Sequence, residues 1–266
     1  MRSLLFTLIF ALVPLTAPNL SWGLTDAEAI NVSGRQRMLS QRMMKDYLMI
    51  GANVKTDAAQ QQLDAAVALF EEQFLALRDY SPNAEIEKKL DAVEAIWLEH
   101  RVKIISQPEK ADAPELMEEN LRLLTACNDV VKAIEKHSGI ASGRLVNMSG
   151  RQRMLSQKIA KTYMAMYWNV DAPSLADEFN QAISLFDASL EELQAYKKND
   201  EPLVDALTRV RNQWAFSQSG FELGDAGRFV PTVISVTTES ILKKMDKITG
   251  QYEVLMNSDQ RLAHRN

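Results

Sequence analysis

The sequence predicts an all-α fold built from two tandem up-down four-helix bundles that are related by an internal repeat. The nine residues SGRQRMLSQ at Ser33–Gln41 recur without change at Ser149–Gln157, and such self-similarity indicates a duplicated structural unit. The 266 residues include only 10 Gly and 8 Pro, beside many Leu, Ala, Glu, Gln and Lys, a composition that favours helices. Apolar residues spaced three and four positions apart predict helices that each bury one face.

The N-terminal residues 1–23 are predicted to be a signal peptide. Arg2 supplies a positive charge, Leu4–Leu15 forms an apolar core, and Ser21-Trp22-Gly23 resembles a cleavage site with small residues. The apolar core is shorter than the roughly 20 residues that span a bilayer. We therefore expect a periplasmic mature chain, and an uncleaved anchor is the alternative.

The first two helices of the mature chain have recognisable start signals. Thr25–Glu28 is a capping-box pattern, in which the Thr hydroxyl and the Glu carboxylate satisfy free backbone N–H groups. This first helix should run through the motif to about Ala52. Thr56 and Asp57 are expected to cap the second helix, which continues to Tyr80.

Two further helices complete the first half. The Ser81-Pro82-Asn83 segment separates the second helix from the third, and a fourth should begin at about Glu115 after a proline-containing joint. Apolar periodicity gives the core-facing positions of these helices. They are Leu63, Val67, Phe70, Phe74 and Leu77 in the second helix, Ile86, Leu90, Val93, Trp97 and Ile104 in the third, and Leu116, Leu121, Leu124, Val131 and Ile134 in the fourth.

The second half repeats the order of the first, which predicts domains at residues 24–139 and 140–266. Phe70 and Leu77 recur 116 positions later, Trp97 recurs 117 positions later, and Lys132, Lys136 and Gly139 recur 111 positions later, as Phe186, Leu193, Trp214, Lys243, Lys247 and Gly250. A helix break near Ser138-Gly139 would place the two bundles side by side. An unbroken helix would stack them end to end, and both arrangements are left open.

Composition limits the functions that the chain can have. The net charge of −5 argues against nucleic acid as a partner, because phosphate backbones require a basic surface. Cys127 is the single cysteine, so no intramolecular disulfide can form. His100, His137 and His264 lack the spacing of metal ligands, and no nucleophile or phosphate-loop motif occurs. We expect no enzyme activity, no metal and no cofactor.

Helical spacing sorts the motif residues into three lines, because residues three, four and seven apart share a face. The lines are Val32–Leu39–Met43, Arg37–Gln41–Met44 and Arg35–Met38–Arg42. The first line is the expected core stripe. The other two carry guanidinium and amide donors that could surround a small anion if another helix covered them, whereas the alternative is a set of ordinary surface arginines. Gly34 and Gly150 lie inside helices, which suggests a close helix approach.

The motif, preceded by Asn31-Val32 and again by Asn147-Met148, resembles the start of the NarX/PilJ-type periplasmic sensor domain. The resemblance covers the mature chain as two tandem copies. It implies a four-helix bundle that dimerises through its first helix, with one arginine from each partner binding an anion across the two-fold axis. Matching glycine to glycine assigns that role to Arg37 and Arg153.

The motif differs from that of the nitrate sensors, which carry Ser-Leu-Arg-Met where this chain has Arg35-Gln36-Arg37-Met38, closer to the pilus-receptor version. Family members also continue into a membrane helix and a signalling module, and this sequence ends at Asn266. The resemblance therefore implies a periplasmic, non-enzymatic binding or sensory accessory protein that recognises a small oxyanion such as nitrate or nitrite. The expected ligand-binding residues are Arg37, Arg153, Arg35, Arg151, Gln36, Gln152, Gly34 and Gly150.

A second interpretation needs no small ligand. The same helix face could dock on the ectodomain of a membrane receptor or chemoreceptor, and a homodimer is also left open. Exposed arginines would favour docking, whereas arginines that face one another would favour a shared anion.

Overall fold

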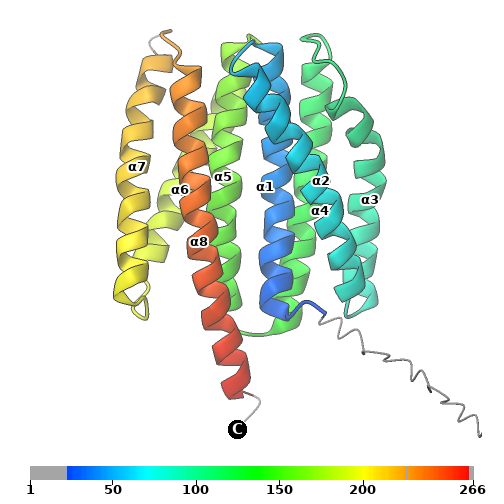
Figure 1. Ribbon diagram of the computed structural model, residues 1–266, viewed down its shortest axis with the longest axis vertical. Helices are drawn as coiled ribbons and strands as arrows, with labels where there is room; N and C mark the ends of the chain where they lie inside the picture. The colour runs from blue at the N-terminus through cyan, green and yellow to red at the C-terminus, as the bar shows by residue number, and fades with distance from the viewer. Residues whose placement is uncertain (1–22, 226, 264–266) are drawn as a thin grey trace, which may run out of the picture.

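The computed structural model describes residues 23–225 and 227–263, so the predicted signal segment lies outside the described residues except for Gly23. The described residues form eight α-helices and no strand (Figure 1), which confirms the all-α prediction. The helices are α1 (Asp26–Gly51), α2 (Thr56–Tyr80), α3 (Ala84–Ile104), α4 (Ala113–Ser138), α5 (Gly143–Tyr167), α6 (Leu175–Gln194), α7 (Glu201–Asp225) and α8 (Pro231–Ala263).

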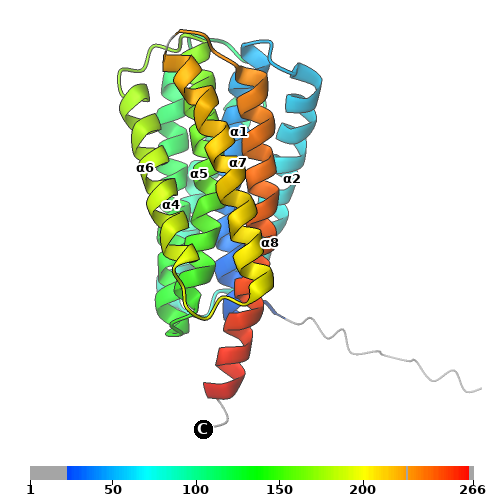
Figure 2. The same cartoon turned by 90° about the vertical axis from the view of Figure 1, so that its left-hand side faces the viewer.

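The two bundles lie side by side, with α1 and α5 packed against each other as a parallel pair at the centre (Figures 1 and 2). α1 also packs on α2 and α4, and α5 packs on α6 and α8. The side-by-side arrangement follows from the end of α4, where Gly139 adopts a φ of 63° and a left-handed conformation that closes the helix. The end-to-end alternative is therefore wrong.

The helix starts agree in part with the sequence prediction. Thr25 and Glu28 form the expected capping box, in which the Thr25 hydroxyl accepts from the Glu28 N–H at 3.3 Å and Glu28 accepts from the Thr25 N–H at 2.7 Å. The predicted cap of α2 by Thr56 and Asp57 is wrong. Lys55 occupies the N-cap position in a left-handed conformation, and no side chain bonds the free N–H groups there.

The predicted core positions of α2, α3 and α4 are buried with one exception. Leu121 of α4 is 43% exposed, because it lines an open groove between α3 and α4 rather than the bundle core. Trp97 is a core residue, and its ring centroid lies 4.3 Å from that of Phe70. Its repeat equivalent Trp214 lies 4.2 Å from Phe186, so the duplication extends to core packing.

The motif helices differ from the amphipathic prediction. Val32, assigned to the core stripe, is only partly buried, whereas Arg37 and Gln41 on a predicted polar line are fully buried. The reason is that α1 and α5 cover each other's polar face, so each motif helix is enclosed by its own bundle and by its repeat partner. Helical periodicity alone could not reveal this second partner.

Candidate functional site

Arg37 and Arg153 face each other across the contact between α1 and α5. Both side chains are buried, with 0% exposure. The Nη2 atoms of both arginines lie 3.4 Å from the position that a Cβ would occupy on Gly34, so they are at most twice that distance apart. The internal repeat therefore brings its two equivalent arginines to one place.

The two arginines make reciprocal contacts with the opposite helix. Arg37 Nη2 donates to the backbone carbonyl of Asn147 at 3.3 Å and to the Asn147 Oδ1 at 2.8 Å. Arg153 Nη2 donates to the backbone carbonyl of Asn31 at 3.1 Å. Because Asn147 is the repeat equivalent of Asn31, the pair follows an approximate two-fold symmetry within one chain.

Gly34 and Gly150 make room for these guanidinium groups. A Cβ on Gly150 would lie 3.2 Å from Arg153 Nη2 and 3.7 Å from Arg37 Nη2. The predicted close approach is thus between a glycine backbone and arginine side chains. Glycine at these helix positions costs about 1 kcal/mol relative to alanine, and in return both guanidiniums fit between the helices.

The two arginines differ in their counter-charges. Arg153 Nη1 lies 2.6 Å from the Asp246 carboxylate, which also bonds Arg35 at 3.1 Å. Arg37 Nη1 instead donates to the neutral Asn128 Oδ1 at 3.0 Å, and among the described residues no carboxylate forms an ion pair with Arg37. Arg37 is therefore a buried cation with neutral acceptors only.

A further difference between the halves explains why Arg37 lacks a carboxylate. Glu135 is the repeat equivalent of Asp246, but it accepts a hydrogen bond from the Asn147 amide rather than from an arginine. The Asn147 side chain thus stands between the Glu135 carboxylate and Arg37. In this half of the site, the Glu135 carboxylate is therefore linked to Arg37 only through the Asn147 side chain.

The buried charges shift the pKa values of both arginines. Burial lowers the pKa of Arg37 to about 9, with a further lowering from the positive charges of Arg151 and Arg153. Burial also lowers the pKa of Arg153 to about 10, where Arg35 lowers it further and Asp246 opposes the shift. The Nε atoms of both side chains have no hydrogen-bond partner. The pair thus has unused donors and uncompensated positive charge, both of which favour an anion.

The remaining predicted residues are divided between this pair and the bundle cores. Arg35 reaches the pair through Asp246, and Arg151 acts on Arg37 through its charge. Gln36 and Gln152 do not reach the pair. Their Nε2 atoms donate to the backbone carbonyls of helices α2 and α6, which tie each motif helix into its own bundle; these bonds are Gln36 to Phe70 at 3.1 Å and Gln152 to Phe186 at 2.9 Å.

Sequence reasoning missed a second buried polar cluster about two turns further along α1. Lys45 Nζ lies 2.7 Å from the Glu239 carboxylate of α8 and 3.0 Å from Gln157 Oε1 of α5. The adjacent Asp46 is fully buried, and burial raises its pKa to about 6. The signal that could have found this cluster is the repeat, because Lys45 recurs as the fully buried Lys161.

The hydrogen-bond donors of the site are suited to binding an anion. They are guanidinium and amide groups, which hold oxyanions, and Asp246 adds a carboxylate beside Arg153. The described residues include no group of three or more His, Cys, Asp or Glu side chains placed to hold a metal ion. No helix in the described part of the chain combines the length and the apolar character needed to cross a membrane.

Comparison with known proteins identifies one family. The family model PilJ, described as the N-terminal domain of type IV pili methyl-accepting chemotaxis transducers, matches residues 20–119 and again residues 140–222. The two matches include both copies of the arginine motif. Neither the curated proteins nor the solved structures gave a match.

Proposed function

Because the chain belongs to the PilJ family of N-terminal domains of type IV pili methyl-accepting chemotaxis transducers, in two tandem copies, we propose that it is a periplasmic sensory module that binds one small oxyanion between Arg37 and Arg153. The family supplies the sensory role. The facing arginines supply the proposed ligand class, and their convergence on one point beside Gly34 is the observation that carries the proposal.

Arg37 is the proposed primary ligand residue. It is fully buried, it bonds only neutral acceptors, and its Nε donor is unused. A buried positive charge without a counter-charge is costly, so an anion that reached it would gain both charge compensation and charge-assisted hydrogen bonds. Arg153 already has the Asp246 carboxylate and would contribute its second guanidinium nitrogen from the opposite helix.

Binding must change the contact between α1 and α5, because both arginines are closed off from solvent. An anion would take over donors that now bond the backbone carbonyls of Asn147 and Asn31. Those two bonds join α1 to α5, so replacing them with a shared ligand alters how the two helices are held. A ligand shifts an equilibrium only by contacting the two states differently, and this exchange of acceptors would supply that difference.

The limited space favours a small anion such as nitrate or nitrite over a large organic acid. Both Nη2 atoms lie within 3.7 Å of the positions that Cβ atoms would occupy on Gly34 and Gly150, so an anion that contacts both of them must be small. Docking on a receptor through the same helix face is less well supported, because that face is covered by the contact between α1 and α5.

Isothermal titration calorimetry with nitrate, nitrite and acetate tests this proposal. We expect heat with at least one of the three and its loss in the double variant Arg37→Met plus Arg153→Met. Arg144→Met, at an exposed arginine that pairs with Glu192, is the matched control and should bind as the unchanged chain does. Silence with all three anions, or full binding by the double variant, would overturn the assignment.

A further inference from the structure

The groove between α7 and α8 gathers positive charge on the second bundle. α7 and α8 pack side by side, with α7 at the outer edge of this bundle (Figures 1 and 2), and the groove between them has a volume of about 420 Å³. The lining residues are Ala206, Arg209, Ser240, Lys243, Lys244 and Lys247. Four of these six side chains are cations, and none is an acid.

These four cations are not compensated by direct ion pairs. Among the described residues, no carboxylate lies within ion-pair distance of Arg209, Lys243, Lys244 or Lys247, and Lys244 Nζ instead contacts the Ser240 hydroxyl at 2.6 Å. The pKa of the buried Glu239 carboxylate is lowered mainly by Lys45 and Arg42, and the positive charge of Lys243 adds a smaller effect. In a chain of net charge −5, four cations with no acid among the lining residues form a local excess of positive charge.

Glu201 and Asp205 bound the groove at one end, where a second concavity shares Arg209 and Lys247 with it. They leave the part between Arg209 and Lys244 free of acid.

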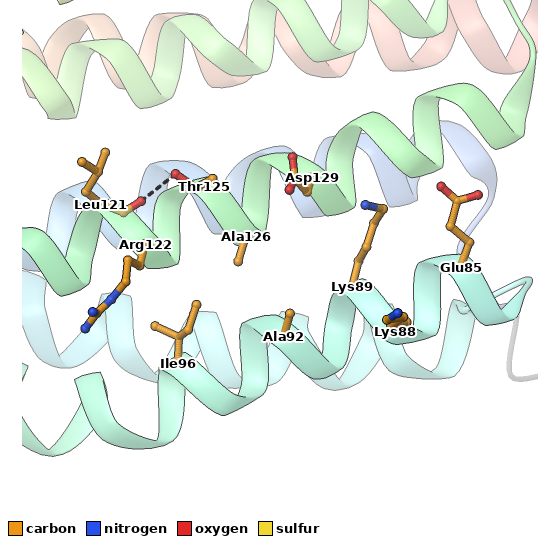
Figure 3. A pocket seen from close by; sticks show the side chains of 10 residues that line it. All are labelled: Glu85, Lys88, Lys89, Ala92, Ile96, Leu121, Arg122, Thr125, Ala126 and Asp129. Atoms are coloured by element: carbon orange, nitrogen blue, oxygen red, sulfur yellow. Dashed lines mark hydrogen bonds between the residues drawn. The ribbon is translucent and has the colours of Figure 1, made fainter.

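The corresponding groove of the first bundle shows that this charge has arisen by divergence. In the groove between α3 and α4, Ala92, Ala126 and Asp129 lie near the middle, and Leu121 lies toward one end (Figure 3). Alignment of the repeats pairs Ala92 with Arg209, Asp129 with Ser240 and Ala133 with Lys244. Each of these three differences adds a positive charge to the second groove or removes a negative one.

The difference is not a uniform increase in basicity. Lys88 and Lys89 of α3 line the first groove, and their equivalents in the second are Asp205 and Ala206. The cations that line the second groove are instead Arg209 of α7 and three lysines of α8, which are Lys243, Lys244 and Lys247. Lys243 and Lys247 are four residues apart on one helix face, an arrangement in which like charges repel by about 0.2–0.5 kcal/mol per pair.

We propose that the α7–α8 groove binds a small multivalent oxyanion that carries phosphate groups or several carboxylates. Four converging cations match such a ligand in charge, since ammonium and guanidinium groups bind phosphate and carboxylate through charge-assisted hydrogen bonds. The groove volume falls within the roughly 300–1,000 Å³ of small-molecule sites. This site is separate from the Arg37–Arg153 pair and does not depend on it.

Calorimetric titration at low ionic strength with pyrophosphate and with citrate tests the inference. We expect binding of at least one probe and its weakening by about tenfold or more in Lys243→Gln plus Lys247→Gln. The repeat equivalents Lys132→Gln plus Lys136→Gln remove the same number of charges from the same positions of the first bundle and should change the affinity by less than about twofold. Arg209→Gln, on the opposite wall, should weaken binding as well.

The controls separate a real site from general attraction. Thermal unfolding of each variant verifies folding, and the Arg37→Met plus Arg153→Met variant should bind pyrophosphate unchanged. The proposal is overturned if neither probe binds, or if the Lys132/Lys136 variant weakens binding as much as the Lys243/Lys247 variant does. Sedimentation with phosphatidylglycerol vesicles distinguishes the source of the anion, because binding to vesicles without binding to either free probe would contradict a small-molecule site.

Discussion

Arg37 on α1 donates a hydrogen bond to the backbone carbonyl of Asn147 on α5. The repeat equivalents of these two residues, Arg153 and Asn31, make the same contact in the opposite direction. One chain thereby contains the two-fold arrangement that two separate subunits would otherwise have to form. The reciprocal contact explains why both arginines are buried, and it makes the site a shared property of the two repeats.

Two glycines inside helices, Gly250 of α8 and Gly150 beside the arginine pair, should respond in opposite ways to substitution by alanine. Gly250→Ala lies in a helix with no atom within 4 Å of the new Cβ, so it should raise the free energy of unfolding by about 0.5–1 kcal/mol. Gly150→Ala would put a Cβ 3.2 Å from Arg153 Nη2 and should give no such gain while weakening anion binding. Urea unfolding and calorimetry of both variants check this, and equal stabilisation by both would contradict the tight fit.

At the other end of the α1–α5 contact, a side chain at position 51 would clash with the Trp168 ring. A Cβ on Gly51 would lie 2.3 Å from the Trp168 ring, so Gly51→Ala should destabilise the chain by about 1–3 kcal/mol through overpacking. Adding Trp168→Leu should relieve the clash, giving a double variant more stable than the sum of the two single changes. Strict additivity in a double-mutant cycle would show that the two residues do not touch.

We expect the Asp246 carboxylate to stabilise the folded chain and to weaken anion binding. Asp246→Asn removes the counter-charge of Arg153 and should lower the free energy of unfolding by about 1–3 kcal/mol, less than for a fully buried pair because Asp246 is 45% exposed. Anion affinity should rise, since neither arginine then has a carboxylate. Glu192→Gln, whose carboxylate pairs with the exposed Arg144, is the control. An affinity that falls on losing Asp246 would contradict this role.

Because His100 is buried, we expect the folded chain to lose stability in mild acid. Burial lowers its pKa from 6.5 to about 4, and Glu119 opposes the shift. Between these values the unfolded chain binds a proton that the folded chain does not, so the free energy of unfolding falls as the pH decreases from 6.5 toward 4. At pH 5 the effect of this group should be about 2 kcal/mol.

Urea unfolding at pH 7 and pH 5 measures this effect by comparison with His100→Gln, which should lose less stability on acidification. His137→Gln, at an exposed histidine, should behave as the unchanged chain does. Asp46, whose pKa is raised to about 6, contributes in the opposite direction but is common to all three proteins and cancels in the comparison. Equal pH dependence of His100→Gln and the unchanged chain would refute a neutral buried histidine.

Much of the fold could be predicted because the repeat and the apolar periodicity are local properties of the chain. Stripes such as Leu63–Leu77 identify helices and their core faces directly. The buried polar line of α1 could not be predicted in this way, because its partner is α5, more than a hundred residues distant in sequence. Leu121 was misassigned for a related reason, since periodicity marks apolar positions but does not tell a core from an open groove.

The candidate site was predicted only in part. The repeat and the family resemblance identify Arg37, Arg153 and the glycines beside them, and the structure brings these four residues together. Asn128 and Asp246 are supplied by α4 and α8, and nothing in their local sequence indicates that they meet an arginine. Their unequal charges break the symmetry of the repeat, which only the three-dimensional packing reveals.

The most direct test of the account is the stoichiometry of nitrate and nitrite binding by titration calorimetry. A single anion held between Arg37 and Arg153 predicts one bound ligand per chain, and each single variant, Arg37→Met or Arg153→Met, should lower the affinity by about tenfold or more. Two bound anions per chain with each single variant losing only one of them would contradict a shared site, as would unchanged affinity in both variants.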